Sequence, residues 1–181
     1  NTVAYAYDKN SNLDTVRDAS SALDFDYDAR DRVTRVDNLG TPDAPRVILA
    51  YTYDGVGNVR SVTDTISGQP GATTAYDYDF LNRVDRITQT GTGVGAKRVD
   101  MSYNPLGQFD TITRYASLDT AQLVASSKYD YDALNRIDLL THRNPQGGTI
   151  SFFDLGYDDA GRITSIADID GTATYGYDDT S

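Results

Sequence analysis

Paired aspartates are the residues of this sequence whose type and spacing could do chemistry. Asp77 and Asp79 are two residues apart, as are Asp130 and Asp132, so on a β-strand each pair would share one face. Two neighbouring carboxylates can act as general acid and general base, or they can bind Ca²⁺. Such pairs recur along this chain, however, whereas an active site is normally single. We therefore interpret one aspartate of each pair as the start of a turn and the other as a solvated strand residue.

No other residues of the sequence form a catalytic or metal-binding pattern. The run Asp24, Asp26, Asp28 lacks the glycine and the distal glutamate of a calcium-binding loop. His142 is the only histidine, and we interpret it as a surface histidine next to the loop at Asn144-Pro145 rather than as part of a Ser–His–Asp arrangement. The chain has no cysteine, which excludes disulfides and thiolate ligands. The sequence thus predicts no catalytic residue, no metal site and no cofactor.

The composition narrows the class of protein further. The 181 residues include 16 Lys and Arg against 27 Asp and Glu, a net charge of −11 that argues against binding nucleic acid or an anionic membrane. No apolar run approaches the roughly 18 residues of a membrane span, and the start is not signal-like. Tyr, Thr, Val and Ile favour strands, so we expect an almost entirely β protein. Because the chain lacks an initial methionine and ends just after a motif has begun again, we expect it to be a piece of a longer protein.

A tyrosine recurs every 20 to 28 residues and defines an internal repeat. These column tyrosines are Tyr7, Tyr27, Tyr53, Tyr78, Tyr103, Tyr131, Tyr157 and Tyr177. An aspartate follows all but one of them, as Asp8, Asp28, Asp54, Asp79, Asp132, Asp158 and Asp178, and Asn104 follows the other. Four positions after the tyrosine stands a glycine or a small polar residue, namely Gly57, Gly107, Gly161, Ser11, Asp31, Asn82 or Asn135. A second tyrosine often stands two positions earlier, and 13 of the 14 tyrosines occupy these two columns, so tyrosine is architectural here.

Each repeat predicts one β-hairpin. Residues two apart share a strand face, so the paired rings lie on one side of the sheet. The aspartate can accept hydrogen bonds from later backbone amides and start a type I turn, and the fourth residue suits positive φ, as in short hairpins with a bulge. The aspartate turns should line one edge of a meandering sheet, namely the edge formed by one end of every strand. The variable links should line the other, and among them we expect the segments 68–71, 91–95 and 144–148 to be longer loops.

The returning half of each hairpin carries two apolar columns and a recurring cation. Val59 and Val62 are one example of the columns, and they are three residues apart. Strict alternation would place them on opposite faces, so either a bulge shifts the register or both faces are partly covered. We expect the arginines after the turns to pair with aspartate or stack on tyrosine rather than bind a ligand; they are Arg32, Arg83, Arg136 and Arg162.

The segments 129–137 (Tyr-Asp-Tyr-Asp-Ala-Leu-Asn-Arg-Ile) and 157–163 (Tyr-Asp-Asp-Ala-Gly-Arg-Ile) resemble the repeat of the RHS/YD-repeat family. The resemblance extends over nearly the whole chain, with seven full repeats and the start of an eighth, so we expect residues 1–181 to be a single array. Segment 101–109 departs from the pattern by using Asn104-Pro105 in its turn. The Asp-Pro-x-Gly segment linked to self-cleavage in the family has no match, so we do not expect self-cleavage.

The resemblance implies an all-β fold of antiparallel hairpins in a continuous curved or spiralling sheet, which is a segment of a shell wall. Related shells occur in bacterial polymorphic-toxin proteins, toxin-complex proteins and teneurins. It therefore implies a non-enzymatic structural role in a secreted or cell-surface protein, with bacteria as the expected source. The implied partners are the remainder of the shell and an enclosed toxin domain.

One alternative remains open from the sequence, namely a carbohydrate-binding or adhesive repeat whose exposed tyrosines stack on sugars. Choline-binding-like repeats are the nearest analogue, but they depend on tryptophan, which this chain lacks. Burial of Tyr53, Tyr78 and Tyr131 against neighbouring repeats would count against stacking on sugars. In either case the two end strands of the sheet predict self-association through unpaired edges.

Overall fold

The structure is a computed structural model that describes residues 2–178 of the chain, and all of the regular secondary structure there is β. The first nine strands are β1 (Ala4–Tyr7), β2 (Leu13–Arg17), β3 (Ala22–Tyr27), β4 (Val33–Asp37), β5 (Val47–Tyr53), β6 (Val59–Ile66), β7 (Gln69–Tyr78), β8 (Val84–Gly91) and β9 (Val94–Tyr103). The others are β10 (Phe109–Tyr115), β11 (Leu123–Tyr131), β12 (Ile137–Arg143), β13 (Thr149–Tyr157), β14 (Ile163–Asp168) and β15 (Gly171–Thr174). Residues 2–178 contain no helix that could cross a membrane.

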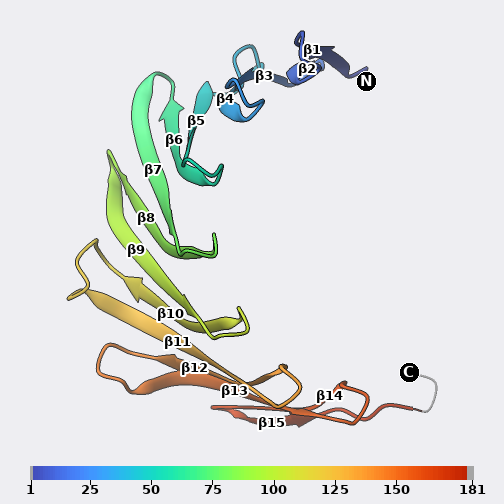
Figure 1. Cartoon of the computed structure of the whole chain (residues 1–181), viewed down its shortest axis with the longest axis vertical. Helices are drawn as coiled ribbons and strands as arrows, with labels where there is room; N and C mark the ends of the chain where they lie inside the picture. Colours follow the sequence, from blue (N-terminus) through green and yellow to red (C-terminus); the bar gives the residue numbers. More distant parts are fainter. Residues whose placement is uncertain (1, 179–181) are drawn as a thin grey trace. The chain divides into compact units, whose positions relative to one another are not determined.

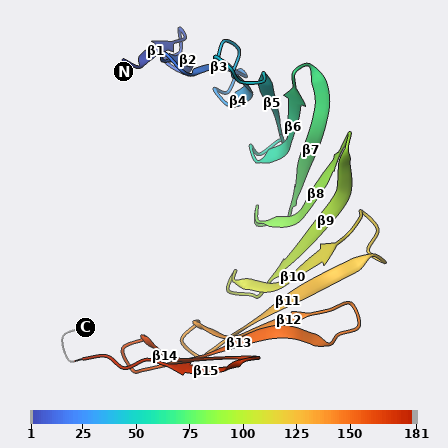
Figure 2. The ribbon, with the colours of Figure 1, turned by 180° about the vertical axis from the view of Figure 1, so that it is seen from behind.

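The 15 strands form one open sheet in which their order is the order of the sequence. The strands are antiparallel, and the chain meanders from each strand to its neighbour, as Figures 1 and 2 show from opposite sides. This confirms the all-β fold of antiparallel hairpins that the repeat predicts.

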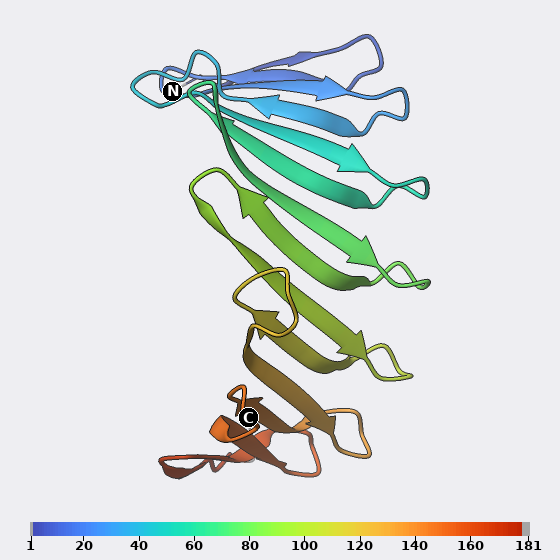
Figure 3. The same cartoon turned by 90° about the vertical axis from the view of Figure 1, so that its left-hand side faces the viewer.

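The chain divides into two compact units, Asn1–Lys97 and Arg98–Ser181. In the first unit the turns β1–β2, β3–β4, β5–β6 and β7–β8 all lie at one edge of the sheet, and the links between hairpins lie at the other (Figure 3). In the second unit the turns β9–β10, β11–β12 and β13–β14 likewise share one edge. The predicted separation of fixed turns from variable links therefore holds within each unit.

A β-bulge in every hairpin decides between the two arrangements that the apolar columns left open. In the third hairpin Tyr51 pairs with Val62 and Tyr53 with Val59, which leaves Arg60 as the extra residue. Because of this extra residue, Val59 and Val62 both lie on the tyrosine face although they are three apart. The same shift occurs in all seven hairpins, with extra residues Asp14, Thr34, Arg60, Asp85, Asp110, Asp138 and Thr164.

Two of the links are shorter than the sequence suggests. The glycine-rich segments 68–71 and 91–95 are expected to be longer loops, but the strands continue into both. Only Ser67 and Gly68 separate β6 from β7, and only Thr92 and Gly93 separate β8 from β9. Positive φ values of 51° at Ser67 and 79° at Gly68 allow such a tight reversal.

Each unit is a single layer with little conventional core. Of the described residues only Ala22, Asp37, Ser127 and Thr141 are buried. The tyrosines and the apolar columns of the inner hairpins are half-buried against their neighbours in the same sheet. Cohesion must therefore come from contacts between adjacent hairpins, and the polar groups of the turns supply many of these.

Candidate functional site: the turns and the tyrosine column

Each aspartate turn is closed by the side chain of its first residue. In the third turn, Oδ1 of Asp54 accepts hydrogen bonds from the backbone amides of Val56, Gly57 and Asn58 at 3.0, 2.7 and 2.9 Å. The Asp54 amide donates to the carbonyl of Asn58 at 2.9 Å, which closes the hairpin. Asn104 uses its amide oxygen in the same way, at 3.0 Å from the amides of Leu106 and Gln108. The predicted role of the first residue therefore does not require a charge.

The fourth residue of each turn has positive φ in all seven hairpins. The values are 69° at Ser11, 58° at Asp31, 109° at Gly57, 60° at Asn82, 84° at Gly107, 64° at Asn135 and 83° at Gly161. This backbone conformation favours glycine, asparagine and aspartate, which accounts for the residue types in that column. It also sets up the bulge that follows.

Hydrogen bonding keeps the turn aspartates ionised. The Arg32 side chain donates from Nε to Oδ2 of Asp28 at 2.8 Å and lowers the pKa of Asp28 to about 2. The backbone amide of the arginine four residues later is the largest cause of the lowered pKa of Asp79, Asp132 and Asp158. Each of these carboxylates is therefore ionised and hydrogen-bonded within its own turn.

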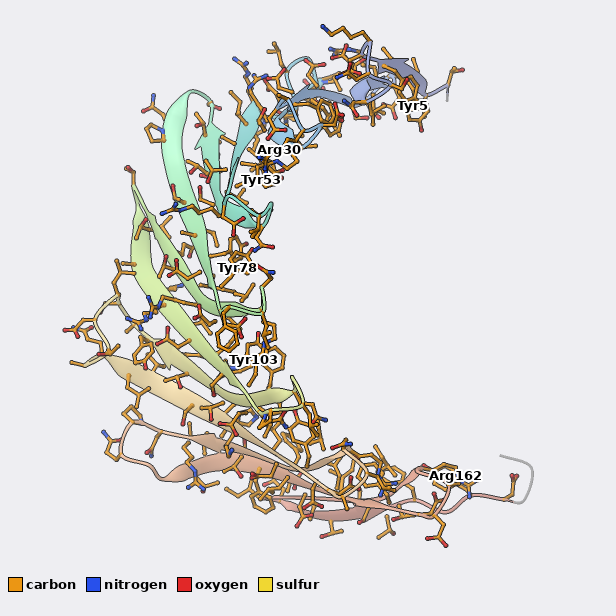
Figure 4. The ribbon with its side chains drawn as sticks, viewed as in Figure 1. Tyr5, Arg30, Tyr53, Tyr78, Tyr103 and Arg162 are labelled. Carbon is orange, nitrogen blue, oxygen red and sulfur yellow. The ribbon has the colours of Figure 1, made fainter. Side chains whose placement is uncertain are left out.

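The column tyrosines join each hairpin to the one before it. The Tyr53 hydroxyl donates to the backbone carbonyl of Val33, the first residue of the preceding return strand, at 2.6 Å. The same contact occurs at 2.6 to 3.0 Å for six tyrosines: Tyr27 to Leu13, Tyr53 to Val33, Tyr78 to Val59, Tyr131 to Phe109, Tyr157 to Ile137 and Tyr177 to Ile163. Figure 4 shows Tyr53 and Tyr78 on the same face of the first unit. Burial raises the pKa of Tyr27, Tyr78 and Tyr131, which keeps these hydroxyls protonated as donors.

An arginine reinforces several of these junctions. Arg32 is bound to Asp28 in its own turn, and its guanidinium carbon lies 4.2 Å from the ring centre of Tyr53 in the next hairpin. Arg136 lies 4.1 Å from the Tyr157 ring, and Arg162 lies 4.4 Å from the Tyr177 ring. These distances are typical of cation–π contacts. The predicted alternatives for the arginines, pairing with aspartate and stacking on tyrosine, are thus realised together.

Sequence reasoning missed a second kind of junction, in which an amide replaces the arginine. Asn58 donates from Nδ2 to Oδ2 of Asp54 at 3.0 Å and to Oδ1 of Asn82 in the next turn at 3.1 Å. Asn12 donates in the same way to Asp31 at 2.7 Å, and Gln108 donates to the backbone carbonyl of Asn135 at 2.9 Å.

The fourth residue of the next turn differs between the two kinds of junction. The acceptors of the three amides are Asp31, Asn82 and Asn135, so a polar residue stands there. In contrast, Arg32 and Arg136 face Gly57 and Gly161. The signal in the sequence was a match between successive turns. An asparagine or glutamine five positions after one column tyrosine goes with a polar residue four positions after the next, and an arginine goes with a glycine.

The structure corrects the interpretation of His142. It lies within β12 beside the turn at Asn144, as expected, but it is half-buried rather than a surface residue. Its Nδ1 lies 2.8 Å from Oγ of Ser127, which is fully buried and also accepts a hydrogen bond from Arg114 at 2.8 Å. The ring of Phe153 packs edge-on against the His142 ring, with 6.3 Å between the ring centres. Within residues 2–178 no carboxylate is hydrogen-bonded to His142, so this serine–histidine pair lacks an acidic third member.

The paired carboxylates do not form a common site. Asp79 belongs to its turn and binds Arg83 at 2.6 Å, whereas Asp77 lies 3.4 Å from Arg86. Likewise Asp132 binds Arg136, and Asp130 lies 3.8 Å from Lys128. No group of three or more histidine, aspartate or glutamate side chains that could hold a metal ion occurs among the described residues.

Comparisons with known proteins complete the description. A scan against models of protein families gave no match, and neither did a search of curated proteins. Among solved structures, the chain is similar to a porin-like protein from Bacteroides uniformis, with a TM-score of 0.38 and 16% identity over 74% of this chain and 53% of that one. It is also similar to TcdB2-TccC3-TEV, with a TM-score of 0.29 and 12% identity over 92% of this chain and 12% of that one. Both TM-scores and both identities are low, so we draw no conclusion about function from either protein.

Proposed function

We propose that this chain is a non-enzymatic structural repeat module, a segment of an RHS/YD-repeat shell that encloses a toxin domain or builds a secreted or cell-surface protein of bacteria. The observation that carries this proposal is the use of the repeated polar residues between hairpins. Six column tyrosines donate to the preceding return strand, and the turn aspartates bind their own turns. The residues that define the repeat are thus engaged in building the sheet.

The adhesive alternative has less support. A tyrosine that stacks on a sugar must offer an open ring face, but Tyr53, Tyr78 and Tyr131 are half-buried with their hydroxyls already bonded. The arginines of neighbouring turns cover the rings of Tyr53 and Tyr157. Sugar stacking would therefore compete with the contacts that hold successive hairpins together.

The experiment compares stability with sugar binding in the same variants. Tyr131→Ala should lower the midpoint of urea unfolding strongly, and Tyr131→Phe should lower it less, because only the hydroxyl bond is lost. Titration of the unmodified chain with a panel of saccharides, followed by tyrosine fluorescence, should show no saturable change. Saturable sugar binding that Tyr131→Phe abolishes without lowering the midpoint would favour the adhesive role instead.

The enclosing role is tested in the longer protein that carries this array. We expect an enclosed domain to resist protease while the array is folded and to become sensitive in the Tyr131→Ala variant. Equal resistance of the enclosed domain in the unmodified protein and in a variant whose array is unfolded would contradict enclosure.

A further inference from the structure

In the part that the structure describes, the outer edge of β1, which faces away from β2, lacks the contacts that join successive hairpins. No strand lies beside this edge among residues 2–178, and Figure 4 shows Tyr5 on this outermost strand of the first unit. Tyr5 and Tyr7 are 59% and 62% exposed, whereas the column tyrosines of the inner hairpins are half-buried. In the described part of the chain the Tyr7 hydroxyl has no hydrogen bond. The contacts made by the equivalent tyrosines are therefore missing at Tyr7.

The last column tyrosine shows where those contacts come from. Tyr177 donates to the carbonyl of Ile163 at 2.7 Å and lies under Arg162 at 4.4 Å, although no return strand follows it within residues 2–178. The backbone amide of Tyr175 donates to the carbonyl of Thr164 at 2.8 Å. The preceding return strand thus supplies the carbonyl, and the arginine directly before that strand supplies the guanidinium. A return strand placed beside β1 would supply the same groups to Tyr7.

We propose that the outer edge of β1 is a docking site for a return strand of this same repeat, an antiparallel strand with arginine followed by two apolar residues three positions apart. The proposal rests on the proposed function and names the partner that the outer edge of β1 accepts. It continues an interface that six tyrosines of this chain already make. The partner's arginine would lie over the Tyr7 ring, and its next carbonyl would accept from the Tyr7 hydroxyl.

The β14–β15 junction fixes the register of the docked strand. Superposing the repeat places Tyr175 on Tyr5 and Tyr177 on Tyr7. The pairs Ser165 with Thr174 and Ile166 with Ala173 then become Ser165 with Ala4 and Ile166 with Val3. The backbones of Tyr175 and Thr164 are hydrogen-bonded to each other, so the next pair along the strands, Thr174 with Ser165, is a non-hydrogen-bonded pair. In such a pair the Cα atoms are about 4.5 Å apart. A disulfide fits across a pair of that spacing.

The experiment uses the chain of residues 1–181 and a synthetic peptide of residues 158–168. Since the chain has no cysteine, Ala4→Cys gives a single thiol on β1. The peptide variant Ser165→Cys should form a disulfide with this chain at least about tenfold faster than the matched variant Thr164→Cys, whose side chain would lie on the opposite face. In fluorescence anisotropy, Tyr7→Phe in the chain should weaken peptide binding about fivefold, the equivalent of one hydrogen bond. Arg162→Ala in the peptide should also weaken it several-fold.

Three results would overturn the docking proposal. One is equal disulfide formation at the two peptide positions, and another is peptide binding that neither Tyr7→Phe nor Arg162→Ala changes. The third is a rapid disulfide dimer of the Ala4→Cys chain without peptide, which would mean that a second copy occupies this edge. Unchanged stability of Tyr131→Phe and Tyr131→Ala would instead refute the proposed function, whereas their destabilisation without register-specific docking would refute the docking site alone.

Discussion

The guanidinium carbon of Arg136 lies 4.1 Å from the ring centre of Tyr157, and the Tyr157 hydroxyl donates to the carbonyl of the very next residue, Ile137, at 2.7 Å. The residue directly before a return strand and the first residue of that strand thus hold the face and the tip of a ring in the next hairpin. Arg32 and Val33 hold Tyr53 in the same manner. A short sequence, arginine followed by an apolar residue, therefore specifies how one hairpin is placed on the next.

Removal of a column hydroxyl should destabilise an inner hairpin but not the first one. Tyr157→Phe keeps the ring and its arginine but leaves the Ile137 carbonyl without its donor, so the free energy of unfolding should fall by about 1 kcal/mol. Tyr7→Phe is the matched control, because the Tyr7 hydroxyl has no hydrogen bond within residues 2–178, and we expect no change. Urea unfolding followed by circular dichroism measures both. Equal effects of the two substitutions would contradict the role given to the column hydroxyls.

Acid should destabilise the sheet through the turn aspartates. The folded-state pKa of Asp28 is about 2, below the value of about 3.9 for an unfolded aspartate. Its contribution to stability is therefore complete above pH ~4 and is lost as the pH falls toward ~2. Asp28→Asn keeps an acceptor for the turn but cannot titrate, so the unfolding midpoint should depend less steeply on pH in that window.

The fifth turn offers the reciprocal control for this pH dependence. Asn104 already occupies the first position there, and Asn104→Asp introduces a carboxylate among the same backbone donors. We expect the dependence on pH between ~4 and ~2 to become steeper in this variant. Parallel pH profiles of the two variants and the unmodified chain would show that the turn carboxylates are not the titrating groups.

The hairpins and their turns were predictable because they depend on residues close together in the sequence. Alternation in the strand, the side chain of Asp54 and positive φ at Gly57 all act within five residues. The turn residues indicated a hairpin with a bulge, but the effect of that bulge on the register was not predictable, since columns three residues apart fit either a shifted register or two covered faces. The environment of His142 also depends on Ser127 from another strand, and only the pairing of β11 with β12 brings them together.

The choice between the two kinds of junction should behave as a coupled pair. Gly161→Ala should cost about 1 to 2 kcal/mol, because φ is +83° there and a Cβ strains that backbone. Gly161→Asn should cost less, since asparagine tolerates this conformation. Combining it with Arg136→Asn recreates the contact seen between Asn58 and Asn82.

A double-mutant cycle with urea unfolding measures that coupling. The double variant should be more stable than the sum of the single changes predicts, by about 0.5 kcal/mol or more. The positive coupling would arise because the asparagine introduced at position 136 could donate to the one introduced at position 161, whereas each single substitution leaves the new amide without its partner. Strict additivity would mean that the residues of successive turns are chosen independently.

Ser127 and His142 provide the sharpest test of the proposed non-enzymatic role. The serine hydroxyl is fully buried, accepts from Arg114 and lies 2.8 Å from His142 Nδ1, while no carboxylate within residues 2–178 supports the histidine. An excess of a fluorophosphonate reagent should therefore give no adduct by intact-protein mass spectrometry. Ser127→Ala should instead lower the free energy of unfolding by about 1 to 3 kcal/mol, because Arg114 and His142 lose a shared partner. An adduct on Ser127 that disappears in His142→Gln would identify a nucleophile and its base, and the non-enzymatic role would then have to be abandoned.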